Sequence, residues 1–439
     1  MNNFSSFKGI SRRRFLAATG LAVAAPTIIP SSVLGADGQT APSERITMGV
    51  VGWGMQGPGN TDAFLNVPGC QVVAACDLDK KHLNSAVSRI NSHYKNTDCK
   101  AYADYREMIA RKDIDTVMLA VPDNWHALIS TEAANQKKDI YGEKPLARTI
   151  AEQKAIVKAV QQNQRIWQTG SWQRSQGPFR RAAEIVRNGL IGKVTRVEVG
   201  LPSGHSDFAK TKDKMAVSQP PPELDYERWI GPAQMESYIE GRVHMNWRWN
   251  YNIGGGQLLD WIGHHCDIAH WGLDADNSGP SEVEGQGEFP PKDAVWNTCT
   301  KYRVTCKYPN DVTVILAGGH NDIRGGTKWI GTEGWVWVDR GAYDASTLDW
   351  FAKLPDSAKL RLYKSDNHQA NFIDCVRSRK PTITPVETAH HSAIPGHLGL
   401  ISMLVGRKIK WDNAKELILD DPGASALLTR PYRDPYKLV

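Results

Sequence analysis

The sequence predicts an α/β protein with two domains: a parallel sheet joined by crossover helices, then an α+β domain with a large, mostly antiparallel, open sheet. Between residues 45 and 170, short β-rich runs alternate with longer helical runs, as a parallel sheet requires. After residue 170 the β-rich runs follow one another, with helical runs on either side. A chain of 439 residues is long enough for two or three cores, so we expect domains at 37–170 and 171–439.

The first domain contains a series of candidate strands, at residues 45–52, 70–76, 115–121, 139–142 and 166–169. Helical stretches between them include 104–111 and 127–137. The strands of a parallel sheet all end at the same edge, where ligands bind. The residues that directly follow these strands are therefore the candidates for function.

The second domain begins with an amphipathic helix at 179–189 and a strand at 194–200. Residues 201–253 are rich in Pro, Trp and Tyr and show little periodicity, which indicates a long ordered excursion over a cleft. β-type segments are predicted from about residue 283 to residue 339, among them 301–308, 312–317 and 334–338, and helices are predicted at 368–379 and 387–405. One face of such an open sheet needs covering, and self-association into a homo-oligomer would cover it.

A glycine-rich turn, Gly-Val-Val-Gly-Trp-Gly-Met-Gln-Gly, follows the first strand at residues 49–57. Gly52 allows a tight turn, Gly54 allows backbone N–H groups to approach a pyrophosphate, and Gly57 allows the next helix to pack close to its strand. The N-terminus of that helix then faces the negative charge. This arrangement predicts a Rossmann dinucleotide site, and the residues of the turn expected at the cofactor are Gly52, Trp53, Gly54, Met55, Gln56 and Gly57.

An acidic residue, Asp77, follows the second strand. A carboxylate at this place accepts hydrogen bonds from both ribose hydroxyls and repels a 2′-phosphate, so the sequence favours NAD over NADP. Lys80 and Lys81 lie nearby and keep NADP open as the alternative. An ordinary tight turn before a helix would not account for Asp77.

The N-terminus resembles a twin-arginine export signal. Three arginines at 12–14 precede an apolar run of small residues that ends at Ile29, and a cleavage-type sequence follows at 33–36. We expect residues 1–36 to be removed on export to the periplasm; Pro26 and Pro30 break the run, which disfavours a membrane anchor. This segment holds four of the six net positive charges, and the remaining +2 gives no support for nucleic-acid binding.

Two further loops follow strands of the first domain. In the loop at 121–126, Asn124 and Trp125 are expected at the edge of the cofactor, and a helix N-cap made by Asp123 or Asn124 is an equal alternative. In the loop at 141–145, Lys144 stands at the end of a strand and can reach both the nicotinamide and a substrate hydroxyl. The alternative for Lys144 is an ordinary surface lysine.

The strongest pattern of the second domain is a glycine run at 254–256 followed by helical sequence to residue 271. Asp260 and His264 are four residues apart and therefore lie on one face of this helix. Oxidation of an alcohol needs a base that removes the hydroxyl proton as hydride leaves carbon, and a neutral histidine suits this task near pH 7. Asp260 would either bind the substrate hydroxyls or orient the imidazole.

A zinc site formed by His264, His265 and His270 is the competing interpretation of this helix. Adjacent histidines on a helix point about 100° apart, and their spacing matches no helical zinc motif. We therefore expect no metal there, with His265 or His270 as a buried structural histidine.

Together these motifs resemble the Gfo/Idh/MocA family, named for glucose–fructose oxidoreductase and inositol dehydrogenase, over nearly all of the chain after the signal segment. The marks are the glycine turn, Pro122-x-x-x-His126, Glu143-Lys144-Pro145, Gln173-Arg174-Ser175, Gly189-Leu-Ile-Gly192 and the pattern at 254–267. The resemblance implies that Lys144 orients substrate and nicotinamide, that Asp260 binds substrate hydroxyls and that His264 transfers the proton. It also implies cofactor contacts from Pro122, Asn124, Trp125, His126, Glu143, Lys144 and Gln173.

The resemblance implies an oxidoreductase that moves hydride between NAD and a secondary alcohol of a sugar, polyol or glycoside, and Trp247, Trp249 and Trp261 offer flat faces for stacking on a sugar ring or for packing. Because free NAD is scarce outside the cytoplasm, an exported enzyme would hold its cofactor tightly and restore it within the site. The alternative is an NAD-dependent, redox-neutral glycoside hydrolase that oxidises its substrate transiently and then eliminates the glycosidic bond. The set of Lys144, Asp260 and His264 argues against a third interpretation, a non-enzymatic sensor.

Overall fold

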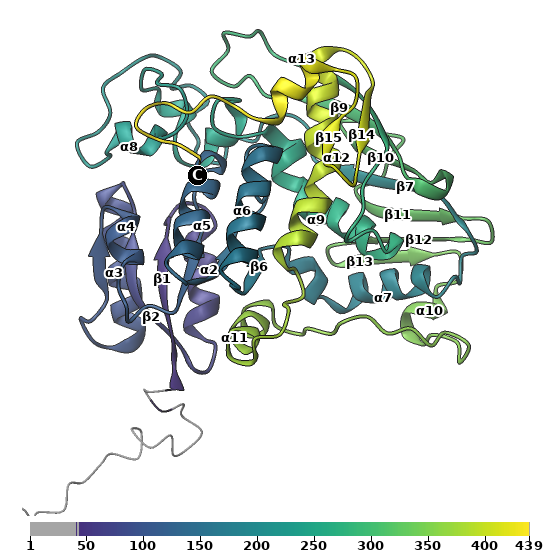
Figure 1. Cartoon of the computed structure of the whole chain (residues 1–439), viewed down its shortest axis with the longest axis horizontal. Coiled ribbons are helices and arrows are strands. Elements are labelled where there is room, and N and C mark those ends of the chain that lie inside the picture. Colours follow the sequence, from purple (N-terminus) through teal and green to yellow (C-terminus); the bar gives the residue numbers. More distant parts are fainter. Residues whose placement is uncertain (1–40, 42–43, 439) are drawn as a thin grey trace, which may run out of the picture. The chain divides into compact units, whose positions relative to one another are not determined.

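The structure, a computed structural model, describes residue 41 and residues 44–438; the predicted signal segment at 1–36 lies outside them. A parallel sheet with strand order β3-β2-β1-β4-β5-β6 forms the first part of the fold (Figure 1). Its strands are β1 (Ile46–Val51), β2 (Cys70–Cys76), β3 (Lys100–Tyr102), β4 (Thr116–Leu119), β5 (Asp139–Gly142) and β6 (Trp167–Thr169). Every residue of β4 and β5 is buried, as expected for strands covered by helices on both faces.

Crossover helices connect these strands: α2 (Gly57–Leu65), α3 (Lys80–Tyr94), α4 (Tyr105–Ile109), α5 (His126–Asn135) and α6 (Ile150–Gln162). The predicted strands are confirmed within two residues at each end. The edge strand β3 was not predicted, because its three side chains are exposed or half-buried and show no apolar pattern. The strand order is that of a dinucleotide-binding sheet, whose ligands lie at the carboxyl ends of the strands.

A second sheet has nine strands in the order β13-β12-β11-β7-β10-β9-β8-β14-β15. Only β7 and β10 run parallel, and the other neighbouring pairs are antiparallel. Their bounds are β7 (Val194–Leu201), β8 (Glu282–Glu288), β9 (Lys301–Lys307), β10 (Thr313–Gly318), β11 (Gly326–Gly331), β12 (Trp335–Asp339), β13 (Ala342–Ala345), β14 (Ile409–Asp412) and β15 (Leu417–Ile418). The predicted fold class, an α/β protein with a large, mostly antiparallel second sheet, is confirmed.

Helices α7 (Gly177–Arg187), α9 (Gly256–Leu273) and α12 (Val386–Val405) pack on this second sheet (Figure 1). Helix α9 can approach closely because a Cβ at Gly272 would lie 2.6 Å from the ring of Trp329. Helix α12 also packs against α6, so it joins the two sheets into one body. The remaining helices are short or peripheral: α8 (Tyr226–Ile230), α10 (Asp349–Ala352), α11 (His368–Ser378) and α13 (Pro422–Ser425).

Residues 201–253, hereafter the excursion, contain α8 and two 3₁₀ turns, Glu240–Arg242 and His244–Trp249. The excursion contacts the first domain, since Asn124 Nδ2 donates to the Ile230 carbonyl oxygen at 2.8 Å and Trp125 Nε1 donates to the Trp229 carbonyl oxygen at 2.9 Å. It fills the role predicted from its composition, an ordered segment over a cleft.

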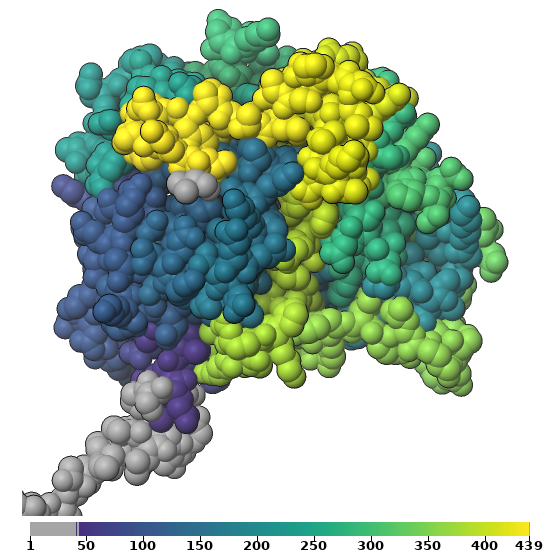
Figure 2. All heavy atoms as spheres, in the orientation of Figure 1, coloured from purple at the N-terminus to yellow at the C-terminus, as the bar shows by residue number. Residues whose placement is uncertain are grey.

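The C-terminal tail, residues 426–438, crosses from the second sheet onto the first domain and the excursion (Figure 2). Arg430 Nε donates to Glu152 on α6 at 2.7 Å, and Arg433 Nη2 donates to the Glu227 carbonyl oxygen of the excursion at 2.9 Å. The tail therefore fixes the excursion against the first domain. Within the described part of the chain, no helix is both long and apolar enough to cross a membrane.

Candidate active site

A cavity of about 550 Å³ opens at the carboxyl end of the parallel sheet. Its lining comes from the loops after β1, β2, β4 and β5, from the excursion, from α9 and from the C-terminal tail. The predicted site residues that line it are Gly52, Gly54, Met55, Gln56, Asp77, Pro122, Trp125, Glu143, Lys144, Asp260 and His264. Loops far apart in the sequence thus converge on one cavity.

The glycines of the turn are required for different physical reasons, two by close packing and one by the open space of the cavity. Gly52 has φ +91°, and a Cβ there would lie 2.3 Å from the Ala120 carbonyl oxygen, while a Cβ at Gly57 would lie 2.1 Å from the Gly52 carbonyl oxygen. Both residues are therefore required by packing. A Cβ at Gly54 would meet nothing within 4 Å, so this position opens onto the cavity. No side chain caps the N-terminus of α2, which leaves its N–H groups available to an anion.

Asp77 stands beside this turn at the end of β2. Its Oδ2 accepts from the backbone N–H of Trp53 at 2.7 Å, and its Oδ1 accepts from the N–H of Asp79 at 2.8 Å. Burial raises the pKa of the Asp77 carboxyl, and the hydrogen bond from Asp79 opposes that rise. The side chain of Trp53 packs in the core and donates to Ser85, so only its backbone serves the turn.

The loop after β4 divides into residues that line the cavity and residues that brace it. Pro122 and Trp125 line the cavity. Asn124 is fully buried and turned toward the excursion, and His126 lies between the carbonyl oxygens of Pro145 and Val121, at 2.8 and 3.0 Å. The alternative of a helix N-cap does not hold, because neither Asp123 nor Asn124 caps the following helix.

Lys144, after β5, is not a surface lysine. Its Nζ donates to Asp260 Oδ1 at 3.0 Å and to the Asp260 carbonyl oxygen at 2.8 Å. Helix α9 can come this close because a Cβ at Gly263 would lie 2.8 Å from the Cβ of Lys144. The neighbouring Glu143 accepts from Asn60 of α2 at 2.7 Å, which ties the lysine loop to the first turn of α2.

Asp260 is held as a carboxylate by two cations. Arg248 Nε of the excursion donates to Asp260 Oδ1 at 3.0 Å, beside Lys144. Burial by itself would raise the pKa of Asp260, but Lys144 and Arg248 outweigh burial and lower it. The carboxylate makes no hydrogen bond with His264, so of the two roles predicted for Asp260 the geometry favours binding hydroxyls over orienting the imidazole.

His264 lines the same cavity and is 6% exposed. Its Nδ1 is buried and has no hydrogen-bond partner among the described residues. Burial, followed by the charges of Lys144 and Arg340, lowers the pKa of His264 well below its ordinary value. The imidazole is therefore neutral near pH 7 and can accept a proton.

The other polar residues of α9 point elsewhere. His265 Nδ1 lies 3.3 Å from Gln173 Nε2, whereas His270 Nε2 lies 2.6 Å from the hydroxyl of Tyr308. Within residues 44–438, the clusters with metal-ligand geometry do not combine His264, His265 and His270. Gln173 is completely buried and does not line the cavity, although sequence reasoning placed it at the cofactor.

Two arginines at the site were not predicted. Arg248 lies in the excursion, and Arg340 lies between β12 and β13 with its guanidinium 4.6 Å from the ring of Trp172 and 4.5 Å from that of Trp261. Gln173 Oε1 accepts from Arg340 Nη2 at 3.1 Å, so Gln173 positions a residue of the cavity wall. No short motif marks Arg340; only the turn Asp339-Arg340-Gly341 could have drawn attention to it.

The three tryptophans considered for sugar stacking fall into two groups, those that line the cavity and one that is buried in the core. Trp247 and Trp261 line the cavity, whereas Trp249 is completely buried, donates to the Ser206 carbonyl oxygen at 2.7 Å and stacks on His205. Trp249 is therefore a core residue, in line with the packing alternative.

Three relatives illustrate what the chain is similar to. It is 31% identical to inositol 2-dehydrogenase of Salmonella typhimurium over 147 residues, 33% of this chain and 42% of that protein. It is 30% identical to glycosyl hydrolase family 109 protein 2 of Shewanella sp. strain ANA-3 over 176 residues, 36% of this chain and 38% of that protein. The match thus spans less than half the length of these curated relatives. The fold is shared with the crystal structure of scyllo-inositol dehydrogenase from Lactobacillus casei with NAD(H) and scyllo-inositol, at a TM-score of 0.57. The two sequences are 16% identical, and the superposition covers 83% of this chain and 99% of that one.

Family matches cover nearly all of the described chain. Residues 46–171 match the family described as "Oxidoreductase family, NAD-binding Rossmann fold", and residues 176–438 match "Oxidoreductase family, C-terminal alpha/beta domain". The glycine turn, Asp77 and the α9 residues fall inside these matches. The chain belongs to the Gfo/Idh/MocA oxidoreductase family.

Proposed function

We propose that the protein is an NAD-dependent oxidoreductase that moves hydride between the nicotinamide and a secondary alcohol of a sugar, polyol or glycoside. One observation carries the proposal: His264, whose lowered pKa keeps it neutral, lies in the same cavity as an ionised Asp260 and the glycine turn. A neutral imidazole can take up the hydroxyl proton of a substrate while the carboxylate binds other hydroxyls.

The residues at the other end of the cavity fit the cofactor. The uncapped N-terminus of α2 and the open space at Gly54 suit a pyrophosphate, and the Asp77 carboxylate suits a ribose diol. When bound, NAD would supply the hydride acceptor or donor. Trp125 and Lys144 line the cavity between the turn and α9.

The chain's own residues account for the proton and for substrate orientation. Lys144 and Arg248 keep Asp260 ionised, and its Oδ2 has capacity to accept hydrogen bonds from substrate hydroxyls. His264 would accept the hydroxyl proton during oxidation and return it during reduction. Because its pKa is lowered, His264 is already deprotonated at neutral pH and loses its capacity as a base only in acid.

We propose NAD rather than NADP as the cofactor. A 2′-phosphate would meet the Asp77 carboxylate, and Lys81, one of the two lysines that kept NADP open, is paired with Glu223 at 2.8 Å. Neither Lys80 nor Lys81 lines the cavity. A direct comparison of the two dinucleotides by calorimetry tests this choice, and tighter binding of NADP would contradict it.

The main experiment measures absorbance of the purified protein in the reduced-nicotinamide band during incubation with a panel of sugars, polyols and glycosides. A dehydrogenase changes this absorbance with at least one compound. The variant Lys144→Met keeps the aliphatic stem but removes the charge beside Asp260, and it should abolish the change while NAD still binds. If no compound of the panel changed the absorbance and the protein also failed to bind NAD, the proposal would be rejected.

The second candidate is an NAD-dependent, redox-neutral glycoside hydrolase, favoured by the family 109 relatives. It shares the first step, removal of a hydroxyl proton and a hydride, so the same residues serve it. Release of a leaving group from aryl glycosides that depends on bound NAD, with no net nicotinamide reduction, would establish this candidate instead of the first.

We also propose export through the twin-arginine machinery, with a periplasmic location, a tightly held cofactor and a homo-oligomeric state. Arg12 and Arg13 support export, and scarce extracytoplasmic NAD supports retention. The broad nine-stranded sheet supports self-association. Cell fractionation with an Arg12→Lys, Arg13→Lys variant, the NAD content of the purified protein and its mass by light scattering test these three points in turn.

A further inference from the structure

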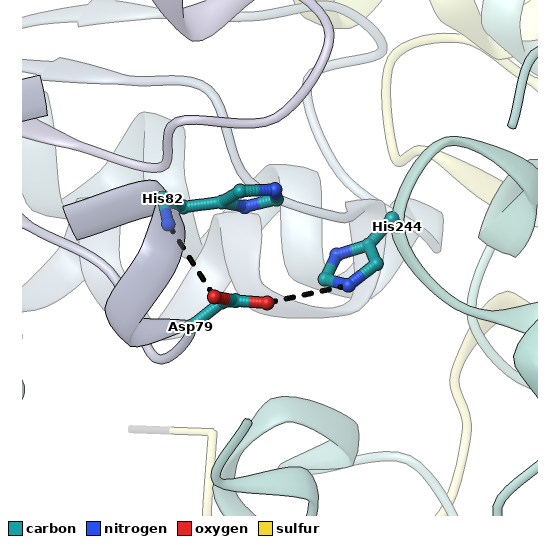
Figure 3. A group of neighbouring side chains, drawn as sticks. All are labelled: Asp79, His82 and His244. Atoms are coloured by element: carbon teal, nitrogen blue, oxygen red, sulfur yellow. Dashed lines mark hydrogen bonds and ion pairs between the residues drawn. The ribbon is translucent and has the colours of Figure 1, made fainter. Parts of the chain in front are cut away.

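Three potential metal ligands meet where the excursion touches the first domain. Asp79 and His82 lie at the start of α3, and His244 belongs to the excursion (Figure 3). One ligand atom of each residue lies within 4.8 Å of the others. Figure 3 shows the Asp79 carboxylate beside both imidazoles, so the three side chains converge although 162 positions separate His82 from His244.

The two oxygens of the Asp79 carboxylate have different contacts. Its Oδ1 caps α3 by accepting from the N–H groups of Lys81 and His82, at 2.7 and 3.3 Å. Its Oδ2 is not needed by the helix and lies 3.4 Å from His244 Nε2. The cap fixes the carboxylate in place while one oxygen stays available to an ion.

Neither imidazole of this cluster has a hydrogen bond with another described residue; the nearest charged contact of His82 is Asp77 Oδ2, 3.8 Å from its Nδ1. The second cluster with ligand geometry differs, because His390 is bonded at both ring nitrogens, to Gln153 at 2.8 Å and Glu416 at 2.9 Å. Hydrogen bonds therefore account for both ring nitrogens of His390. In the first cluster the ring nitrogens have only longer ion-pair contacts, at 3.4 Å for His244 and 3.8 Å for His82.

The backbone of His244 adds an independent observation. Its φ is +51°, in the left-handed region that non-glycine residues rarely adopt. Such a conformation persists where the surrounding structure imposes it, and functional sites are a frequent reason. Here it directs the imidazole toward Asp79 and His82, with ring centroids of the two histidines 4.7 Å apart.

We propose that Asp79, His82 and His244 bind one divalent first-row transition-metal ion of the Zn²⁺ type, which ties the excursion to the first domain. Two imidazoles and one carboxylate suit such an ion, whereas Ca²⁺ and Mg²⁺ prefer oxygen ligands throughout. Bond lengths of about 2.0–2.2 Å require the three side chains to draw together slightly. His82 and His244 line the cavity, so a water molecule there completes the coordination.

The bound ion would act as a clamp beside the dinucleotide. The backbones of Asp79 and Leu224 already form a β-bridge at this junction, and Asp77 is two residues away. Because the excursion covers the cavity, a link between His244 and α3 would slow its opening. The ion is therefore expected to slow release of a bound dinucleotide.

The test uses the full chain without a polyhistidine tag, stripped of metal with a chelator. Titration with Co²⁺, followed by its visible d–d bands, and with Zn²⁺ by calorimetry should give one ion per chain. His244→Asn keeps a residue that tolerates the left-handed backbone, and Asp79→Asn keeps the helix cap. Each should weaken metal binding by on the order of 100-fold or more.

His93→Ala is the matched control, because His93 is an exposed histidine at the far end of the same helix, and binding should not change. Circular dichroism checks that each variant folds. Native chain that binds no Co²⁺, or variants that bind as tightly as the native chain, would overturn the site; so would loss of binding in His390→Gln, which would move the ion to the second cluster.

A second measurement tests whether the bound ion slows the release of NAD. Release of NAD from the native chain should slow about tenfold when Zn²⁺ is added, and His244→Asn should remove this effect. Equal release rates with and without Zn²⁺ would refute the clamp. The metal titration itself does not depend on catalysis, so a failure of the proposed reaction and a failure of the metal site are distinguishable.

Discussion

The two halves of α9 bury polar groups in opposite ways. In the C-terminal half, Asp267 pairs with Arg174 at 2.7 Å and His270 lies 2.6 Å from the Tyr308 hydroxyl. In the N-terminal half, which lines the cavity, His264 Nδ1 has no hydrogen-bond partner among the described residues, and a single oxygen of Asp260 accepts from two cations. Both halves bury polar groups, yet they differ in whether those groups are fully paired.

This contrast distinguishes polar residues of α9 that stabilise the fold from polar residues of the same helix that line the candidate active site. A fully paired polar group in the core stabilises the fold only while its partner is present. Polar side chains that line the cavity, such as Asp260 and His264, are instead placed to contact a ligand. Variants in the two halves of the helix should therefore fail in different assays.

The largest effect is expected for His264→Gln. Loss of the base should lower hydride transfer by roughly 10²- to 10⁴-fold. The melting temperature should change little, because Nδ1 of His264 makes no hydrogen bond in the protein. Single-turnover absorbance and differential scanning calorimetry measure the two quantities. Turnover within tenfold of the native rate would remove His264 from the role of base.

Arg174→Met should show the reverse pattern. Arg174 and Asp267 are 2% and 1% exposed, so the variant leaves a buried carboxylate without its cation and should lower the free energy of unfolding by about 3–5 kcal/mol. Urea denaturation measures this loss. Arg187→Met, which breaks the ion pair to the exposed Asp274, is the control and should cost less than about 1 kcal/mol. Equal losses would contradict the comparison.

The core-facing histidines also predict how stability depends on pH. Burial lowers the pKa of His265 and of His270 to about 4, from 6.5 in the unfolded chain. As pH falls below 6.5, these two histidines take up protons in the unfolded chain but not in the folded chain, so their contribution lowers stability down to about pH 4, by on the order of a few kcal/mol for the two together. Melting temperatures between neutral and acid pH measure this, and His270→Gln should flatten the slope. An unchanged slope in that variant would exclude His270 as a contributor.

The smallest effect is expected at the other end of the cavity. Asp77→Asn keeps an acceptor for Trp53 but removes the charge, so NAD affinity should fall about tenfold, about 1.4 kcal/mol, and discrimination against NADP should weaken. Calorimetry with both dinucleotides measures this. Asp115→Asn, an exposed carboxylate before β4 at the opposite edge of the sheet, is the control and should leave both affinities unchanged. A loss shared by both variants would point to general destabilisation.

The features that depend on local pattern could be predicted from the sequence. The strands of the parallel sheet carry continuous apolar runs, and the glycines at 52 and 57 are needed by contacts that recur wherever a strand turns tightly into a helix. The edge strand β3 was not predicted, because its three side chains are exposed or half-buried and follow no apolar alternation. Asn124, His126 and Gln173 were predicted at the cofactor, and the structure turns them away from the cavity.

The residues and their spacing are enough to predict the fold class, the glycine turn with Asp77, and the set of Lys144, Asp260 and His264, because each rests on spacing within one element or on one strand end. It is in the folded chain that Arg248 is seen to share Asp260 with Lys144, that Arg340 stands between two tryptophans, and that His244 meets Asp79 and His82. Separation along the chain accounts for the difference. Contacts between residues tens or hundreds of positions apart arise from packing of the excursion and α9 against the first domain, and no local pattern records them.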